Sequence, residues 1–253
     1  MLCAAVLPRL SPPRKRGAVS YGDVTSANVV GYQMIKVPNV EFALFTPTFK
    51  AVGGDLDLTD IKIVDADGND LETIGSVVLQ VLDETTGGFT SDQYTHSYGL
   101  YEGWAKNDEP IAFGDVKIPM GKSFSVANGL GDELYFRVSG EVDLVCKNEI
   151  SYNAFSLWGN STPVAIDLTS IDVVDADGEP VETIGGLILQ LLDESTGGVT
   201  ADNYSHSYGL YEGWALNDEP LAPETFFVQP GQSFFVSNGY GDTLYLKLPC
   251  PVK

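Results

Sequence analysis

Two matching sets of aromatic and histidine side chains are the residues of this chain best suited to bind a ligand. Tyr94, His96 and Tyr98 alternate, so on a β-strand their three rings lie on one face. Rings on an open sheet face stack on sugars, whereas rings between two sheets pack as a core. Both interpretations stay open, and the candidate sugar-binding residues are Tyr94, Tyr98, Trp104, Tyr204, Tyr208 and Trp214.

Two acidic loops are candidate Ca²⁺ sites, because Ca²⁺ prefers several carboxylate and carbonyl oxygens on a flexible loop. The spacing is not that of an EF-hand, and Pro180 replaces one acidic residue in the second loop. Asp-Gly pairs also form tight turns without any ligand. Ca²⁺ is thus the one candidate cofactor, and an exposed turn without a ligand is the alternative. The Ca²⁺ ligands would be Asp65, Asp67, Asp70 and Glu72 in the first loop and Asp175, Asp177 and Glu182 in the second.

The sequence shows no catalytic constellation. His96 and His206 are its two histidines, and neither has the nucleophile motif or the cysteine context that covalent catalysis requires. Glu102, Asp108 and Glu109 could supply a glycosidase pair, but carboxylates are abundant throughout this chain. We therefore expect a protein that is not an enzyme and has no catalytic residue.

The chain is a tandem duplication, since Asp57–Val138 returns as Asp167–Leu248 without a gap. A repeat of this length describes a whole domain rather than one layer of a solenoid. We expect a signal-like or basic N-terminal arm over residues 1–21, a first β-sandwich repeat over 22–140 and a second over 141–253.

Strand signals dominate each repeat, and no segment has the period of an amphipathic helix. The fold class we expect is all-β, with two tandem homologous β-sandwich or jelly-roll-like domains and an extra N-terminal strand. The strands expected in the first repeat are Val40–Phe45, Leu56–Val64, Ser76–Leu82, Gln93–Tyr101, Ile111–Ile118, Ser123–Ala127 and Glu133–Val138.

The extra strand is the segment Val24–Val37, which precedes the first repeat. The closing strand of the first repeat stands at the corresponding place before the second, so we expect Val24–Val37 to be additional to the repeated unit. It could pair with its own domain or complete a sheet in a neighbouring copy. The residues expected to self-associate are Val24, Ala27, Val29, Val30, Tyr32 and Met34.

The formal net charge of -21 excludes nucleic acid as a partner, because phosphate binding needs clustered cations. No apolar run reaches the roughly 20 residues that span a bilayer. The opening residues 1–10 resemble a signal-peptide core, but a basic cluster, Arg14-Lys15-Arg16, follows them instead of preceding them. We therefore expect the N-terminus to be a complete or degenerate secretion signal, with a mis-assigned start or a basic arm that docks on a neighbouring copy as the alternatives.

Cys146 and Cys250 flank the second repeat. A disulfide between them would tie its first and last strands together, and it would require an oxidising compartment. Two buried free thiols are the alternative.

Several short segments resemble uncharacterised secreted β-repeat proteins of planctomycete- and verrucomicrobia-type bacteria. They are SANVVGY at 26–32, FALFTPTF at 42–49, YGLYEGW at 208–214, DEP at 218–220 and PGQSFFV at 230–236. The resemblance implies secretion or surface display, and it implies no catalytic residue.

Together these observations predict a non-enzymatic extracellular structural or surface protein that self-associates into a fibre or layer, with N-terminal strand addition as one route. Its partners would be copies of itself. The alternative is a bivalent carbohydrate-binding protein with a glycan partner, which would use the duplicated Tyr and Trp faces.

Overall fold

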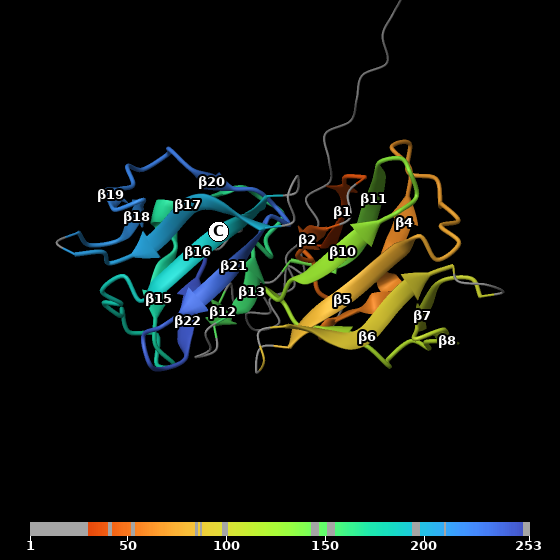
Figure 1. The fold of residues 1–253 in the computed structure, drawn as a ribbon, viewed down its shortest axis with the longest axis horizontal. Coiled ribbons are helices and arrows are strands. Elements are labelled where there is room, and N and C mark those ends of the chain that lie inside the picture. The colour runs from red at the N-terminus through yellow and green to blue at the C-terminus, as the bar shows by residue number, and fades with distance from the viewer. Residues whose placement is uncertain are drawn as a thin grey trace, which may run out of the picture.

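The computed structural model describes residues 30–39, 42–51, 54–83, 86, 88–97, 101–142, 147–150, 155–193, 198–209 and 211–249. Strands and two 3-10 helices make up the secondary structure of these residues, which confirms the expected all-β fold class. Two sets of sheets follow each other along the chain (Figure 1), called here unit 1 (β1 to β11) and unit 2 (β12 to β22).

Unit 1 contains a three-stranded sheet in the order β1-β11-β4, a six-stranded sheet in the order β2-β10-β5-β6-β7-β8, and the pair β3-β9. Its elements are β1 (Val30–Val37), β2 (Ala43–Phe45), β3 (Leu56–Asp57), η1 (Leu58–Asp60), β4 (Lys62–Val64), β5 (Val77–Asp83), β6 (Gly88–His96), β7 (Trp104–Lys106), β8 (Glu109–Pro110), β9 (Lys117–Ile118), β10 (Phe124–Asn128) and β11 (Leu134–Glu141).

Unit 2 repeats this order with β12-β22-β15, β13-β21-β16-β17-β18-β19 and β14-β20. Its elements are β12 (Lys147–Ile150), β13 (Ser156–Gly159), β14 (Ile166–Asp167), η2 (Leu168–Ser170), β15 (Asp172–Val174), β16 (Leu187–Asp193), β17 (Gly198–His206), β18 (Trp214–Leu216), β19 (Glu219–Pro220), β20 (Phe227–Val228), β21 (Ser233–Asn238) and β22 (Leu244–Lys247).

Each unit is a sandwich with its own apolar core. In unit 1 the ring of Phe45 on the six-stranded sheet meets the ring of Phe136 on the three-stranded sheet, with centroids 4.9 Å apart. In unit 2 the rings of Trp158 and Phe234 stack at 5.7 Å between their centroids. Alternating apolar residues on both inner faces remove these side chains from water, which is the main force that holds a sandwich together.

The chain turns sharply where the sequence predicts one long strand over Leu56–Val64. The carboxylate of Asp57 accepts a hydrogen bond from the backbone N–H of Thr59, which caps the short helix η1 and divides the segment into β3 and β4. The segment expected as the strand Ile111–Ile118 contributes only β9 at its end. Local side-chain bonds at such positions compete with sheet pairing.

The N-terminal strand is not additional to the repeated unit, which corrects the expectation from the sequence. Val37 of β1 is in register with Leu134, and Ile150 of β12 is in register with Leu244, the repeat equivalent of Leu134. β12 is therefore the counterpart of β1. The repeat is obscured here because the connection from Phe45 to Asp57 is longer than the connection from Trp158 to Asp167.

Within the described residues, the structure has no helix of the length and apolar character needed to cross a membrane.

Candidate assembly edge

β1 is an edge strand with one hydrogen-bonded neighbour. It pairs antiparallel with β11 along its whole length, from Val30 opposite Glu141 to Val37 opposite Leu134. No other described strand lies on its second side. In an antiparallel pair the backbone groups of alternate residues face the partner and those between them face away. β1 thus offers a row of backbone donors and acceptors to a further strand.

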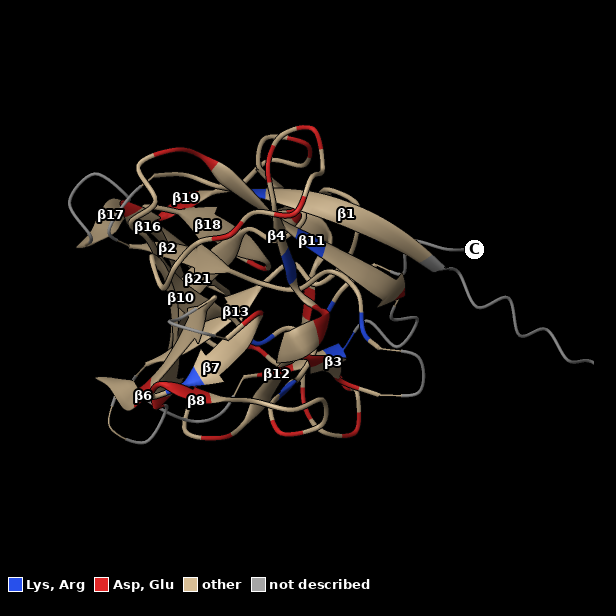
Figure 2. Cartoon of the chain, turned by 90° about the vertical axis from the view of Figure 1, so that its right-hand side faces the viewer, with Lys and Arg blue, Asp and Glu red and all other residues tan. Residues whose placement is uncertain are grey.

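The side chains of β1 leave this edge without negative charge (Figure 2). Its sequence, VGYQMIKV, contains no acidic residue, in a chain of net charge -21. Tyr32 is 71% exposed. Lys36, the single charged residue, forms an ion pair of 2.5 Å with Glu133. Repulsion between copies is therefore weaker at β1 than over the acidic loops.

Three other edge strands, β8, β19 and β12, carry features that oppose strand addition. β8 and β19 have two residues each, and both sequences are Glu-Pro. Proline lacks the N–H that a sheet needs, and charged residues on short edge strands discourage pairing. β12 has four residues against the eight of β1, and its Lys147 takes the place of Met34. β1 is longer than these three edges and, unlike them, contains no acidic residue.

A groove of about 480 Å³ lies beside β1 at the junction of the two units. One wall is formed by residues 33–36 of β1, and the facing wall includes residues 229–233 of unit 2. Lys36 is the one charged residue among the lining side chains.

Four of the six candidate sugar-binding rings are buried, so they do not form an open platform. Tyr94, Trp104, Tyr204 and Trp214 are between 3% and 8% exposed and belong to the two cores. The indole N–H groups of Trp104 and Trp214 donate to the backbone oxygens of Ile61 and Ile171 at 3.0 and 2.9 Å. Tyr208 is 40% exposed, and Tyr98 lies outside the described residues.

Both histidines are structural groups held inside their units. Thr73 donates its hydroxyl hydrogen bond to the backbone oxygen of His96 and also lies 3.1 Å from the Nδ1 of His96. Trp104 packs edge-on against the imidazole. Burial lowers the pKa of His96 to about 4, and it lowers that of His206, held in the same way by Thr183, to about 4 as well.

The acidic loops use their carboxylates for local bonds. Asp65 accepts hydrogen bonds from the backbone N–H groups of Asp67 and Asn69 and from the side chain of Asn69. Asp70 forms an ion pair of 3.1 Å with Arg137. Among the described residues, no group of three or more His, Cys, Asp or Glu side chains is arranged to hold a metal ion. These bonds hold the first loop as a turn, and Ca²⁺ binding at either loop, by Asp65, Asp67, Asp70 and Glu72 or by Asp175, Asp177 and Glu182, stays a prediction.

Several residues expected to be functional lie outside the described part of the chain. They are Val24, Ala27 and Val29 of the predicted self-associating strand, the arm over residues 1–21, and the predicted disulfide partners Cys146 and Cys250. Val30, Tyr32 and Met34 lie on β1 as expected.

Sequence reasoning missed that β1 has a counterpart and that the two units meet through matching faces. A signal for both was present, since Phe42-Ala43-Leu44 returns as Phe155-Ser156-Leu157 at a changed spacing.

Comparison of this chain with protein-family models, with curated proteins and with solved structures found no match.

Proposed function

We propose that this protein is a non-enzymatic extracellular structural or surface protein that associates with copies of itself through the open edge of β1. The observation that carries the proposal is the contrast between β1, long and free of acidic residues, and the short Glu-Pro strands at the far edges of both units. An edge of this kind is a template for a further strand.

The manner of association differs from donation of a loose strand. Residues 30–37 are already bonded to β11, so a neighbouring copy would add its own β1 beside them. Two antiparallel β1 strands related by a two-fold axis would join the three-stranded sheets of both copies into one. Such a contact is isologous and closes a dimer, so a fibre or layer requires a second contact.

An extracellular location is supported by the sequence. The N-terminal residues resemble a signal peptide in part, and the segments at 26–32 and 42–49 resemble secreted repeat proteins. A strongly acidic chain also stays dispersed outside the specific contact, because like charges repel.

The test is a double substitution on β1, Tyr32→Lys with Met34→Lys. Lysine on an edge strand opposes pairing, and Lys147 is the residue that β12 carries in place of Met34. Light scattering after size exclusion and negative-stain electron microscopy would compare this variant with the unchanged chain. Phe113→Lys is the control, because Phe113 is 70% exposed and belongs to the connection between β8 and β9 instead of to β1.

We expect the unchanged chain and the control to associate and the β1 variant to stay monomeric. Added lysines reduce the net negative charge, so general repulsion would not explain that loss. Equal association of all three chains, or a monomeric unchanged chain, would contradict the proposal.

A second candidate function is glycan binding at exposed tyrosines of unit 2. Tyr208 and Tyr211 are 40% and 45% exposed and belong to one turn, in which the backbone N–H of Tyr211 donates to the backbone oxygen of Tyr208. A glycan array with Tyr208→Ala and Tyr211→Ala would test it. Glycan binding that is lost in these variants would favour this candidate. Glycan binding that is absent from the unchanged chain, or that is the same in the variants, would remove it.

A further inference from the structure

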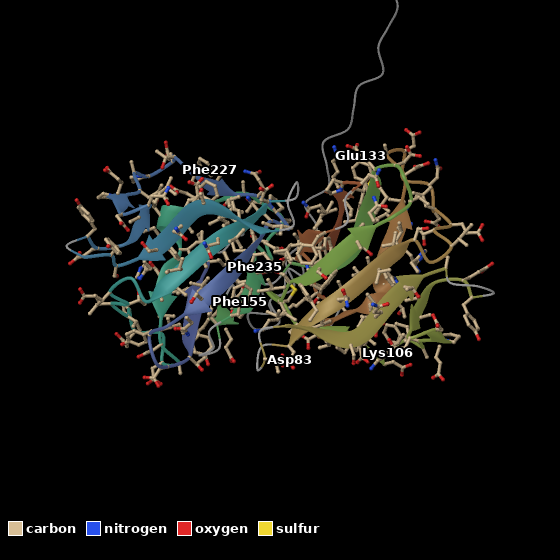
Figure 3. All side chains as sticks on the ribbon, viewed as in Figure 1. Asp83, Lys106, Glu133, Phe155, Phe227 and Phe235 are labelled. Atoms are coloured by element: carbon tan, nitrogen blue, oxygen red, sulfur yellow. The ribbon has the colours of Figure 1, made fainter. Side chains whose placement is uncertain are left out.

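The two units meet through a small apolar cluster of their own outer faces, separate from both cores. Leu82 of unit 1 and Leu157 and Phe235 of unit 2 are buried at its centre. Figure 3 labels Phe155 and Phe235 at this junction. Leu44 and Leu157 are structural equivalents, as are Leu82 and Leu192, so both units contribute the same face.

The contacts across this junction are reciprocal. Phe45 and Trp158 pair with the equivalent residues Phe124 and Phe234, which makes Thr46 the counterpart of Gly159. The Thr46 N–H donates to the Gly231 oxygen at 3.3 Å, and the Gly159 N–H donates to the Gly121 oxygen at 3.3 Å. Gly121 and Gly231 are themselves equivalent, so each bond mirrors the other.

A second reciprocal pair supports the same relation. A Cβ built on Gly231 would lie 2.8 Å from the side chain of Ile35, and one built on Gly121 would meet the side chain of Asn148. Ile35 and Asn148 hold equivalent places on β1 and β12. Ile35 of unit 1 lies against Gly231 of unit 2, and their equivalents, Asn148 of unit 2 and Gly121 of unit 1, lie against each other in the same way. This is the pattern of a two-fold interface between like subunits.

The reciprocal contacts relate unit 1 to unit 2 by an approximate two-fold axis. This relation fails at the point where the axis passes between the units. The Thr46 hydroxyl, which is wholly buried, shares hydrogen bonds with Ser123 of its own unit and with Ser233 of unit 2, the latter at 2.7 Å. At the equivalent place unit 2 has Gly159, and a Cβ there would collide with the Thr46 hydroxyl. The junction has room for one of these two side chains.

In the structure the two units of one chain fill this junction for each other. We propose that copies of the chain exchange units at this junction, so that unit 1 of one copy packs on unit 2 of another, and that Thr46 and Gly159 make unit 1 accept a unit 2 and reject another unit 1. Two facing Thr46 side chains would collide, because the second would stand where Gly159 stands. Two facing Gly159 residues would leave Ser233 without its partner at Thr46, an unfavourable loss for a buried hydroxyl. A second copy therefore pairs in the unlike sense, unit 1 with unit 2.

The experiment uses two full-length variants, each of which disrupts the junction face of one unit. Leu157→Asp blocks the face of unit 2, and its structural equivalent Leu44→Asp blocks the face of unit 1. Both carry Tyr32→Lys and Met34→Lys, so that β1 does not contribute. Near-ultraviolet circular dichroism would establish that each variant is folded, and small-angle X-ray scattering would show that its two units have separated. Leu192→Asp and Leu82→Asp form a second equivalent pair if the first pair unfolds.

Each variant alone should have the 27.2 kDa mass of one chain, and an equimolar mixture should form a heterodimer of twice that mass. In the mixture, the intact unit 1 of one variant meets the intact unit 2 of the other. A mixture that stays monomeric would overturn the pairing surface. Dimers of the Leu157→Asp variant alone would overturn the specificity, because they would join two copies of unit 1.

Thr46→Gly added to the Leu157→Asp variant tests the determinant itself. Mixed with the Leu157→Asp variant that keeps Thr46, this variant should form dimers, because a single Thr46 hydroxyl then lies between two copies of unit 1 and can share hydrogen bonds with both Ser123 side chains, as it does with Ser123 and Ser233 in the structure. A mixture that remains monomeric would remove Thr46 as the residue that sets the specificity.

Discussion

The Nζ of Lys117 donates a hydrogen bond of 2.9 Å to the wholly buried carboxylate of Asp57. Backbone N–H groups of Thr59 and Gly114 donate to the same carboxylate. In unit 2 the equivalent Asp167 keeps the two backbone bonds, from Thr169 and Glu224, but Phe227 stands where Lys117 stands in unit 1. A comparison of Asp57 with Asp167 therefore isolates the contribution of the Lys117 ammonium group.

Asp57→Asn should destabilise the protein by about 1–3 kcal/mol, because charge-assisted bonds to a buried group are lost. Burial by itself raises the pKa of Asp57, but the bonds from Thr59, Lys117 and Gly114 outweigh it and lower the pKa to about 2. This stability is present above pH ~4 and is lost as the pH falls toward 2. Urea unfolding at several pH values would measure it. A larger loss for Asp167→Asn would contradict the role of Lys117.

The two histidines should make the protein less stable as the pH falls from about 6.5 to 4. Burial lowers the pKa of His96 and of His206 to about 4, so the unfolded chain binds more protons in this range. By pH 4 the loss should be about 3 kcal/mol for each histidine. Stability curves against pH would show it. His96→Gln with His206→Gln should flatten this range, and an unchanged slope would contradict the assignment.

Trp104→Phe and Trp214→Phe should each cost about 1–3 kcal/mol, because each leaves a buried backbone oxygen without its indole donor. The oxygens concerned are those of Ile61 and Ile171. Thermal unfolding of each variant would measure the cost. Unchanged stability together with lost binding on a glycan array would instead restore these rings as a sugar site.

Ile74→Asn and Ile184→Asn should stabilise the protein by about 0.5–1 kcal/mol each, because a branched side chain is strained at positive φ. Both isoleucines have φ of 49°, and they are 71% and 72% exposed, so little packing is lost. Ile74→Val is the control, since it keeps the branched side chain and the strain. A destabilised Ile74→Asn chain would show that the exposed side chain makes a contact that matters.

The fold class followed from the sequence because alternating apolar residues and Asp-Gly turns act locally. Gly68, for example, has φ of 84° in the first acidic turn, as a tight connection requires. Which face of a strand is buried depends on residues that are distant in the sequence. Tyr94 and His96 alternate in the same way on an exposed platform and in a core, and the burial of both beside Trp104 shows that they belong to the core.

The place of the N-terminal strand was predicted wrongly for a similar reason. Connections change in length with little energetic effect, so a repeat is lost to sequence comparison wherever a loop differs. Pairing partners are conserved in space instead, as Val37 with Leu134 and Ile150 with Leu244 show. The reciprocal junction at Thr46 and Gly159 depends on that equivalence, so it too was hidden from the sequence.

Hydrogen exchange at increasing protein concentration tests the central claim most directly, because it reports on the backbone groups of β1 themselves. If copies associate through this edge, amides within residues 30–37 should exchange more slowly as the concentration rises, while those of β12 at 147–150 should not change. Exchange of β1 that is the same at all concentrations, in samples that scattering shows to be associated, would contradict the account.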